Sequence, residues 1–208
     1  MTTPAEKMVA EQLAPHGVTD ERVLRVMALL PREEFLAGGT RRFAYEDRAL
    51  AIGWGQTISQ PLVVALMTQA AGPQPSDVAL EVGTGSGYQA AVLAHLCSSV
   101  VTLEREPALA ERAAATLRRL GLDNVDVAVA DGSLGWPERA PYNVIVVACA
   151  ADEVPKALVE QLAEGGRMVI PVSAGHEQPQ DLRLYTRRGA EVTYRSLFPV
   201  VFVPLRTG

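Results

Sequence analysis

The sequence predicts an α/β fold with a doubly wound, mostly parallel sheet, helices on both faces and a helical extension at the N-terminus. Three observations predict it. From residue 78 onward, short apolar runs alternate with segments of helical periodicity. One run, Tyr142–Val147, has almost no polar face, which is typical of a central parallel strand. Before residue 72, two stretches at 6–30 and 61–71 have helical apolar spacing instead. Repeated strand–helix units favour parallel pairing with right-handed crossovers.

The first 30 residues predict two helices. Apolar residues between positions 6 and 30 recur at helical spacing, with an interruption in the middle. The second helix is expected to begin after a cap at Thr19 or Asp20, because short polar side chains accept hydrogen bonds from the first turn. Pro31 ends it.

The rest of the extension is expected to be a loop and a helix. Residues 43–59 lack helical periodicity and contain Gly53 and Gly55, so we expect an ordered loop. Residues 61–71 are predicted to form a helix with Pro61 in its first turn.

The remaining chain alternates between strands and helices and ends in a pair of strands. This pattern predicts one domain over residues 1–208, with an extension and active-site loop at 1–72, an α/β core at 73–208 and an antiparallel C-terminal strand. The predicted strands are 78–82, 100–103, 125–129, 142–147, 167–172, 182–186 and 192–205, and the predicted helices of the core are 88–96, 107–120 and 155–162.

Composition excludes several classes of function. The net charge of −5 is spread along the chain, which disfavours a nucleic-acid partner. No apolar run approaches the roughly 20 residues that cross a membrane, and the N-terminus lacks a signal pattern, so we expect a cytoplasmic monomer. Cys97 and Cys149 lie in apolar runs and are interpreted as core residues, and no metal site is predicted.

A glycine-rich turn follows the first core strand. It runs from Glu81 through three glycines to Tyr88. Glycine suits a sharp turn whose backbone a ligand approaches closely. A dinucleotide fingerprint needs a glycine where Tyr88 stands, so the G-x-G-x-G spacing disfavours a nicotinamide cofactor. S-adenosylmethionine has no pyrophosphate but carries an ammonium and a sulfonium, and the acid at Glu81 suits such a cation.

Two further acids stand at predicted strand ends. Glu104 ends the second core strand, where a carboxylate accepts hydrogen bonds from ribose hydroxyls. Asp131 and Gly132 follow the third strand, beside the expected adenine edge. Taken alone, the glycines also suit a plain tight turn and Glu104 an exposed residue at a helix start. The predicted cofactor-binding residues are Glu81, Gly83, Thr84, Gly85, Ser86, Gly87, Glu104, Asp131 and Gly132.

With these motifs the sequence resembles a known family, the protein-L-isoaspartate O-methyltransferases. The resemblance covers nearly the whole chain, and its most specific stretches are residues 44–47 (AYED) and 55–61 (GQTISQP). Further matching stretches are 80–90, 131–132, 141–143, 161–162, 165–167 and 202–205.

The resemblance implies both an activity and a fold. The implied fold is a Rossmann-like methyltransferase sheet that uses S-adenosylmethionine. The implied substrate is the free α-carboxylate of an L-isoaspartyl residue in damaged proteins or peptides, and the methyl ester formed there re-forms a succinimide, which makes this a repair reaction. The resemblance also implies that Ser59 lies at the catalytic centre.

The residue inventory agrees with this chemistry. An α-carboxyl group has a pKa of about 3.5, so at neutral pH it is already an ionised nucleophile and needs no strong general base. His16, His95 and His176 lie far apart and outside the matching stretches, so we interpret them as surface or helix residues. The Ser59 hydroxyl can orient one carboxylate oxygen. Ser59 and Thr57 also suit a cap of the helix at Pro61.

Substrate contact is expected at two places. Thr57 and Ile58 flank Ser59 in the matching stretch. Damaged sites occur in many sequence contexts, so backbone pairing with an extended peptide is favoured over side-chain recognition. Val201 and Phe202, within residues 200–204, are the candidate edge for that pairing, and an ordinary core strand is the alternative.

Some features leave other functions open. Asn143 stands where the family pattern has Asp, near the expected cofactor end of the sheet. A non-catalytic module that binds the cofactor or isoaspartyl sites is therefore one alternative. A methyltransferase of another carboxylate or a small molecule is the second, although it has no reason to carry residues 56–61. A nicotinamide oxidoreductase is the third, disfavoured by Tyr88.

Overall fold

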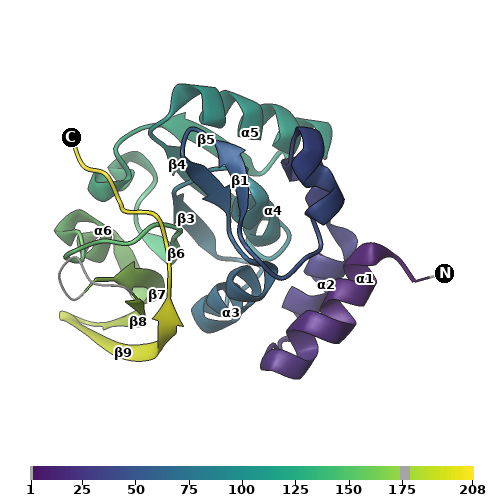
Figure 1. The fold of residues 1–208 in the computed structure, drawn as a ribbon. Helices are drawn as coiled ribbons and strands as arrows, with labels where there is room; N and C mark the ends of the chain where they lie inside the picture. The colour runs from purple at the N-terminus through teal and green to yellow at the C-terminus, as the bar shows by residue number, and fades with distance from the viewer. Residues whose placement is uncertain (1, 174–178) are drawn as a thin grey trace.

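A seven-stranded sheet forms the centre of the protein (Figure 1). The computed structural model describes residues 2–173 and 179–208, so His176 lies outside the described residues. In chain order the strands of the sheet are β3 (Val78–Val82), β4 (Ser99–Glu104), β5 (Val125–Val129), β6 (Tyr142–Val147), β7 (Leu162–Val172), β8 (Gln180–Arg188) and β9 (Glu191–Val200). Their order across the sheet is β5-β4-β3-β6-β7-β8-β9. The strands from β3 to β7 pair in parallel, and β8 pairs antiparallel with both of its neighbours, which confirms the predicted fold class.

Six α-helices accompany the sheet in the described residues, and short π and 3-10 turns connect them. The α-helices are α1 (Pro4–Met8), α2 (Glu21–Leu29), α3 (Pro61–Ala71), α4 (Tyr88–Ala94), α5 (Pro107–Arg119) and α6 (Lys156–Glu160). The first predicted helix continues beyond α1 through a π turn at Val9–Leu13 and a 3-10 turn at Ala14–His16. The Asp20 carboxylate caps α2 by accepting a hydrogen bond from the Arg22 amide at 2.9 Å.

The expectation of a loop over residues 43–59 is wrong in part. This stretch contains an antiparallel hairpin of β1 (Leu50–Gly53) and β2 (Gln56–Ile58). The strands are four and three residues long, too short for an alternating pattern to stand out in the sequence. The chain reverses at Gly53, Trp54 and Gly55, all with positive φ. Glycine adopts that backbone readily, so the two glycines marked the turn of a hairpin rather than a loop.

The two faces of the sheet bury separate apolar clusters. Along β6, Val144 and Val146 face a cluster with residues of α2, α3, α4 and α5, whereas Ile145 and Val147 face a second cluster that includes Leu158 of α6. Alternation of side chains along a strand produces this division. Both cysteines are buried and free, which confirms their interpretation as core residues. None of the helices in residues 2–173 and 179–208 combines the length and the apolar character that spanning a membrane requires.

The order of the strands fixes where a ligand site forms. The chain moves outward from β3 through β4 to β5 and then returns to place β6 on the other side of β3. A crevice opens at such a reversal, beyond the carboxyl ends of the two strands. The C-terminal segment after β9 crosses this end of the sheet (Figure 1). Hydrogen bonds hold it there, from the Ala150 amide to the Val203 carbonyl at 2.8 Å and from the Leu205 amide to the Ala150 carbonyl at 2.7 Å.

Candidate active site

The glycine turn lies between β3 and α4, as the sequence predicts. Gly83, Gly85 and Gly87 have φ of +94°, +52° and +88°, a left-handed conformation that side chains disfavour. Amides at the start of the turn donate to the Leu103 carbonyl of β4, at 2.9 Å from Gly83. The turn is therefore anchored to the neighbouring strand, with its backbone open to the crevice.

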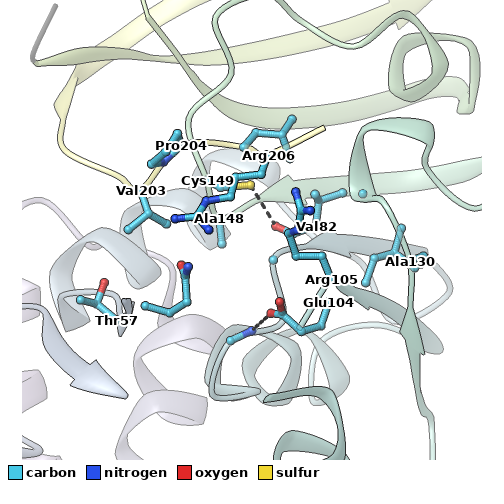
Figure 2. A pocket seen from close by; sticks show the side chains of 16 residues that line it. Thr57, Val82, Glu104, Arg105, Ala130, Ala148, Cys149, Val203, Pro204 and Arg206 are labelled. Atoms are coloured by element: carbon cyan, nitrogen blue, oxygen red, sulfur yellow. Dashed lines mark hydrogen bonds between the residues drawn. The ribbon is translucent and has the colours of Figure 1, made fainter. Parts of the chain in front are cut away.

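Glu104 ties the end of β4 to the turn. One carboxylate oxygen accepts a hydrogen bond from the Gly85 amide at 2.8 Å (Figure 2), and the other accepts from the Glu106 amide at 3.0 Å. The side chain is 7% exposed. Each carboxylate oxygen has a second lone pair, so Glu104 can still accept from two hydroxyls of a ligand.

Glu81 is fully buried at the end of β3. One of its oxygens accepts from the Thr102 hydroxyl, and the other has no hydrogen-bond partner among the described residues. Burial raises the pKa of Glu81 to about 8, and the nearby Glu104 carboxylate contributes to the rise. Burial also raises the pKa of the Cys149 thiol to about 12, so this neighbour stays neutral. An unpaired carboxylate oxygen in such a position suits a cation.

A cavity of about 590 Å³, open to solvent, lies at the carboxyl ends of the strands beside Glu104 and the glycine turn. Val82 and Glu104 line one side, and Val203, Pro204 and Arg206 of the C-terminal segment line another (Figure 2). We call this space the outer cavity. A strand end, a glycine turn and a returning chain segment thus enclose a site of the size that small ligands occupy.

Gly132 brings its backbone unusually close to β3 in the outer cavity. A Cβ atom at this position would lie 2.3 Å from Cγ1 of Val82. A larger residue would push Val82 aside, so glycine lets the turn after β5 lie directly against β3 at the wall of the outer cavity.

A second space, the inner cavity, lies behind the glycine turn. It is lined by Ser59 and Ile58 from the hairpin side and by Glu81, Thr84 and Ser86 from the turn. Thr57 and Ala148 line both the inner and the outer cavity. The Ser59 hydroxyl makes no hydrogen bond within the described part of the chain, although its backbone carbonyl accepts one from Arg32.

An open groove meets the inner cavity at Ser59. It encloses about 1320 Å³ of space that is continuous with solvent, and most of its walls are apolar. Val201, which is 74% exposed, and Phe202 line one wall. The backbone of Phe202 is engaged, because its amide donates to the Gln180 side chain at 2.8 Å and its carbonyl accepts from the same side chain at 3.4 Å. The backbone available for pairing with a ligand is therefore that of Val201.

Two of the predicted cofactor-binding residues lie outside the cavity linings. Gly87 is the N-cap residue of α4, and a Cβ atom added there would lie 3.3 Å from the Cβ atom of Ala113. Asp131 caps the short turn after β5 by accepting from the Ser133 amide at 2.9 Å, and its other oxygen accepts from the Gly208 amide at 2.8 Å. Both residues shape the backbone around the site, and direct ligand contact at either one stays a prediction.

The interpretation of Thr57 and Ser59 as helix caps is wrong. The cap residue of α3 is Gln60, and no side chain at that position accepts a bond from the helix. Asp47 takes this role from a distance, because its carboxylate accepts from the Leu62 amide at 3.1 Å. The same carboxylate accepts from the Gln60 side chain at 2.7 Å. The Ser59 hydroxyl is thereby left free for a ligand.

The expectation that Asn143 lies near the cofactor end of the sheet is also wrong. Its side-chain oxygen accepts from the Val78 amide at 2.9 Å, where β3 begins. Parallel strands put their starts at one edge of the sheet and the site at the other, so Asn143 and the site lie at opposite ends. His16 and His95 are exposed and line none of the three spaces, in agreement with their interpretation as surface residues.

Several lining residues were absent from the sequence prediction. Ala148 and Cys149 follow β6, and Gln56 precedes Thr57 in the hairpin. Arg105 and the segment 203–206 complete the outer cavity. The end of β6 was predictable in principle, because β6 was recognised as a central strand and ligands bind beyond such strand ends. The segment 203–206 overlaps the matching stretch 202–205, but its place beside the outer cavity was not predicted because it depends on how the chain returns after β9.

Comparison with known proteins identifies the family. The sequence model described as Protein-L-isoaspartate(D-aspartate) O-methyltransferase matches residues 4–208. The protein-L-isoaspartate O-methyltransferase of Opitutus terrae is 50% identical over 203 residues, which cover 98% of this chain and 87% of that protein. The enzyme of the same name from Protochlamydia amoebophila is 48% identical, over 95% of this chain and 94% of its own.

Solved structures agree with the sequences. A protein-L-isoaspartate O-methyltransferase superposes with a TM-score of 0.89 and 32% identity over 98% of this chain, which spans 66% of that longer chain. A Plasmodium falciparum protein described by the same activity and solved with S-adenosyl-L-homocysteine gives a TM-score of 0.83 and 26% identity, over 97% of this chain and 98% of its own. The fold matches, the family model covers nearly every residue, and relatives share about half of their residues with this sequence. The chain therefore belongs to the protein-L-isoaspartate(D-aspartate) O-methyltransferase family.

Proposed function

We propose that the chain transfers a methyl group from S-adenosylmethionine to the free α-carboxylate of L-isoaspartyl residues in damaged proteins and peptides. The resulting methyl ester re-forms a succinimide, and repeated cycles return part of the damaged sites to normal aspartate. Family membership and the names of the relatives support this activity. The observation that carries it in this chain is that Ser59 lines both the inner cavity and the open groove.

The residues around the two cavities fit S-adenosylmethionine. Glu104 can accept hydrogen bonds from the ribose hydroxyls. The unpaired oxygen of Glu81 can accept a hydrogen bond from the ammonium group of the donor, which also supplies a balancing positive charge. Gly132 adds no side chain to the wall where the adenine is proposed to lie, and Asp131 fixes that turn. When bound, the donor supplies an electrophilic methyl group on a sulfonium leaving group. The residues proposed to hold it are Glu81, Gly83, Thr84, Gly85, Ser86, Gly87, Glu104, Asp131 and Gly132.

Ser59 is proposed to orient the substrate carboxylate. Its hydroxyl donates to one carboxylate oxygen and leaves the other directed at the inner cavity. The carboxylate is ionised at neutral pH, so the reaction needs alignment rather than a strong base. A neutral hydroxyl also leaves the nucleophile more reactive than an arginine would, because a full positive charge stabilises the carboxylate before it attacks.

The groove is proposed to hold the peptide on either side of the damaged residue. Its apolar walls and the exposed backbone of Val201 suit an extended segment that is held through its main chain. Thr57 and Ile58 lie beside Ser59 at the junction, and Phe202 contributes its side chain to the groove wall. Recognition of this kind accepts many sequences, as a repair activity requires.

No specific observation favours the other functions considered. The sequence feature that suggested a non-catalytic module was Asn143, and that residue bonds to Val78 at the far end of the sheet.

We further propose that the chain acts as one domain, as a monomer and in the cytoplasm, with no nucleic-acid or membrane partner. Sedimentation analysis with and without an isoaspartyl peptide checks the oligomeric state.

The test compares two peptides that differ only in the linkage of one aspartate. With labelled S-adenosylmethionine and substoichiometric enzyme, we expect repeated methylation of the isoaspartyl peptide and none of its normal aspartyl twin. Ser59→Ala should lose at least about tenfold in kcat, because the lost contact orients the nucleophile. Ser98→Ala is the control, since its hydroxyl donates to the Asp77 carbonyl at 2.7 Å, before β4 begins. Equal methylation of both peptides, or full activity of Ser59→Ala, contradicts the proposal.

A further inference from the structure

Arg32 is a charged side chain in an apolar interior. It follows α2, in a 3-10 turn at Arg32–Phe35, and its exposed fraction is 0%. Among the described residues no carboxylate lies within ion-pair distance of it, and its Nη1 atom has no hydrogen-bond partner. Burying an unpaired guanidinium is costly. A protein that retains one gains something by it, so the contacts of Arg32 point to its role.

The guanidinium joins two stretches that are distant in sequence. Its Nε atom donates to the Ala44 carbonyl at 2.8 Å, and its Nη2 atom donates to the Ser59 carbonyl at 2.7 Å. These two carbonyls stand before and after the β1–β2 hairpin. The rigid fork of the guanidinium thus holds both ends of the hairpin at a fixed separation. Residues 44–47 and 55–61 are also the two most distinctive stretches of the sequence, and Arg32 connects them.

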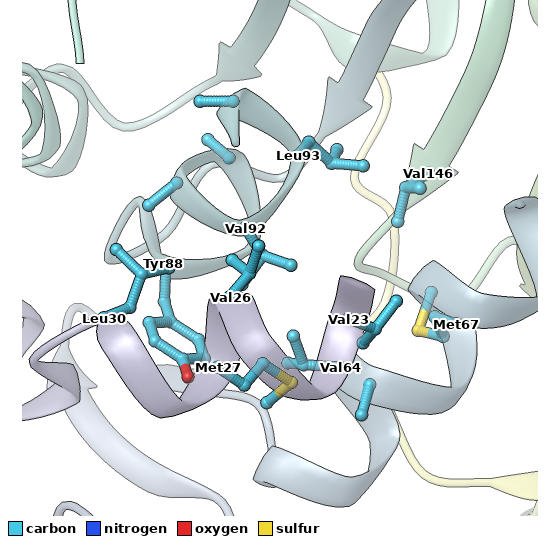
Figure 3. Packing of buried hydrophobic residues seen from close by; sticks show 14 of the residues in the cluster. Val23, Val26, Met27, Leu30, Val64, Met67, Tyr88, Val92, Leu93 and Val146 are labelled. Atoms are coloured by element: carbon cyan, nitrogen blue, oxygen red, sulfur yellow. The ribbon is translucent and has the colours of Figure 1, made fainter. Parts of the chain in front are cut away.

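The same side chain contacts the far side of the site. Its guanidinium carbon lies 4.6 Å from the centre of the Tyr88 ring. Tyr88 opens α4 directly after the glycine turn and is itself 1% exposed. Its ring lies among Met27 and Leu30 of the α2 region (Figure 3). Arg32 therefore bridges the Ser59 backbone and the first residue beyond the glycine turn.

A second contact fixes the chain on the other side of Ser59. Asp47 accepts from the Gln60 side chain at 2.7 Å and from the Leu62 amide at 3.1 Å. Arg32 thus holds the Ser59 backbone through the Ser59 carbonyl, and Asp47 holds the residues that follow Ser59. With the backbone fixed, only rotation about the side-chain bond moves the hydroxyl.

We propose that Arg32 is a positioning residue for methyl transfer, which sets the distance between the Ser59 hydroxyl and the glycine turn. This inference rests on the proposed function. In-line transfer requires that oxygen, methyl and sulfur align, and a displacement of about 1 Å can cost about a hundredfold in rate. Arg32 touches no ligand in this scheme and acts through the carbonyl of Ser59.

The first experiment substitutes Arg32→Lys, which keeps the charge but loses the fork. Arg167→Lys is the matched control, because Arg167 also donates to two carbonyls, those of Ala71 at 3.0 Å and Gly72 at 2.7 Å, at the opposite end of α3. We expect Arg32→Lys to lower kcat by about tenfold or more, with KM for the peptide and the affinity for S-adenosylhomocysteine within about threefold. Arg167→Lys should lower the melting temperature and leave kcat within about twofold.

A second readout is independent of activity. Amide hydrogen exchange over residues 56–60 should become faster in Arg32→Lys and not in Arg167→Lys, since only the first variant releases the Ser59 carbonyl. If the wild-type protein does not methylate isoaspartyl peptides, the proposed function fails while this measurement still tests the anchoring. Arg32→Gln, which retains one donor group, serves as a second variant should Arg32→Lys not fold.

Two outcomes overturn the inference. One is wild-type kcat and wild-type exchange over residues 56–60 in a folded Arg32 variant. The other is a loss of activity that follows the fraction of unfolded protein in both the Arg32 and the Arg167 variants, because that pattern marks a purely structural role. A fall in kcat with unchanged KM and faster local exchange supports the inference.

Discussion

Thr102 of β4 donates a hydrogen bond to the Glu81 carboxylate of β3, directly across the parallel pair formed by the two strands. It is the one hydrogen bond that the Glu81 carboxylate receives within the described residues, and it is too weak to offset complete burial. The pKa of Glu81 is therefore raised to about 8, with burial as the main cause. Two predictions concern this group.

Cofactor binding should strengthen as pH rises. A cation at the unpaired oxygen of Glu81 favours the ionised carboxylate, so at lower pH binding must first remove a proton. We expect the affinity for S-adenosylhomocysteine to increase between about pH 6 and pH 8 and binding to release a proton. Calorimetry in two buffers of different ionisation enthalpy measures that release. Glu81→Gln should bind more weakly and without this pH dependence, and an equal slope in both proteins contradicts the assignment.

The ligand-free protein should respond to pH in the opposite sense. The pKa of Glu81 is about 8 in the folded state and near its reference value of 4.5 in the unfolded state. Below the lower value both states are protonated, and this contribution to stability is complete. As pH rises toward 8 the unfolded state ionises first, so the contribution is lost. We expect the melting temperature of the wild type to fall relative to Glu81→Gln over this range, and parallel curves would falsify the prediction.

Gly132→Ala should damage the outer cavity. The new Cβ would lie 2.3 Å from Cγ1 of Val82 in a buried strand, which must shift. We expect a loss of about 1–3 kcal/mol in the free energy of unfolding, together with weaker cofactor binding. Gly39→Ala is the control, because nothing lies within 4 Å of a Cβ there. Denaturant unfolding of both variants provides the measurement, and equal stability of the two would show that the wall of the cavity yields freely.

Asp47→Ala should lower both stability and activity. Loss of a helix cap costs about 1 kcal/mol, and α3 has no other side-chain cap in the structure. Thr3→Ala removes the cap of α1 at the exposed N-terminus and is the matched control. We expect similar changes in the free energy of unfolding but a loss of kcat only for Asp47→Ala, since only Asp47 holds the residues after Ser59. Kinetics of the two variants at saturating cofactor decide between them.

The sequence predicted the parallel core well because local and long-range signals agree there. The run Tyr142–Val147 is apolar on both faces, and the spacing between Glu81 and Tyr88 defines a turn between a strand and a helix. The bounds of α3 agree with the predicted helix over residues 61–71, because Pro61 marks its first turn. These features depend on a few neighbouring residues, so a single sequence contains the information.

The features that escaped prediction depend on distant parts of the chain. Arg32 reads as an exposed residue because charged side chains are rarely buried, and its two carbonyl partners lie 12 and 27 residues away. The hairpin before Ser59 is too short for a periodic signal. The Asp131 carboxylate also accepts a hydrogen bond from the Gly208 amide, a contact across 77 positions of sequence that no local pattern predicts.

The C-terminal segment links the two proposed ligand sites. Val203 lines both the outer cavity and the groove, so with the ligands placed as proposed above one short piece of chain would form a wall of both sites. A shift of this segment when one ligand binds therefore moves a wall of the other ligand's site. The affinities of the two ligands should therefore be coupled, and by linkage each ligand should change the affinity of the other by the same factor.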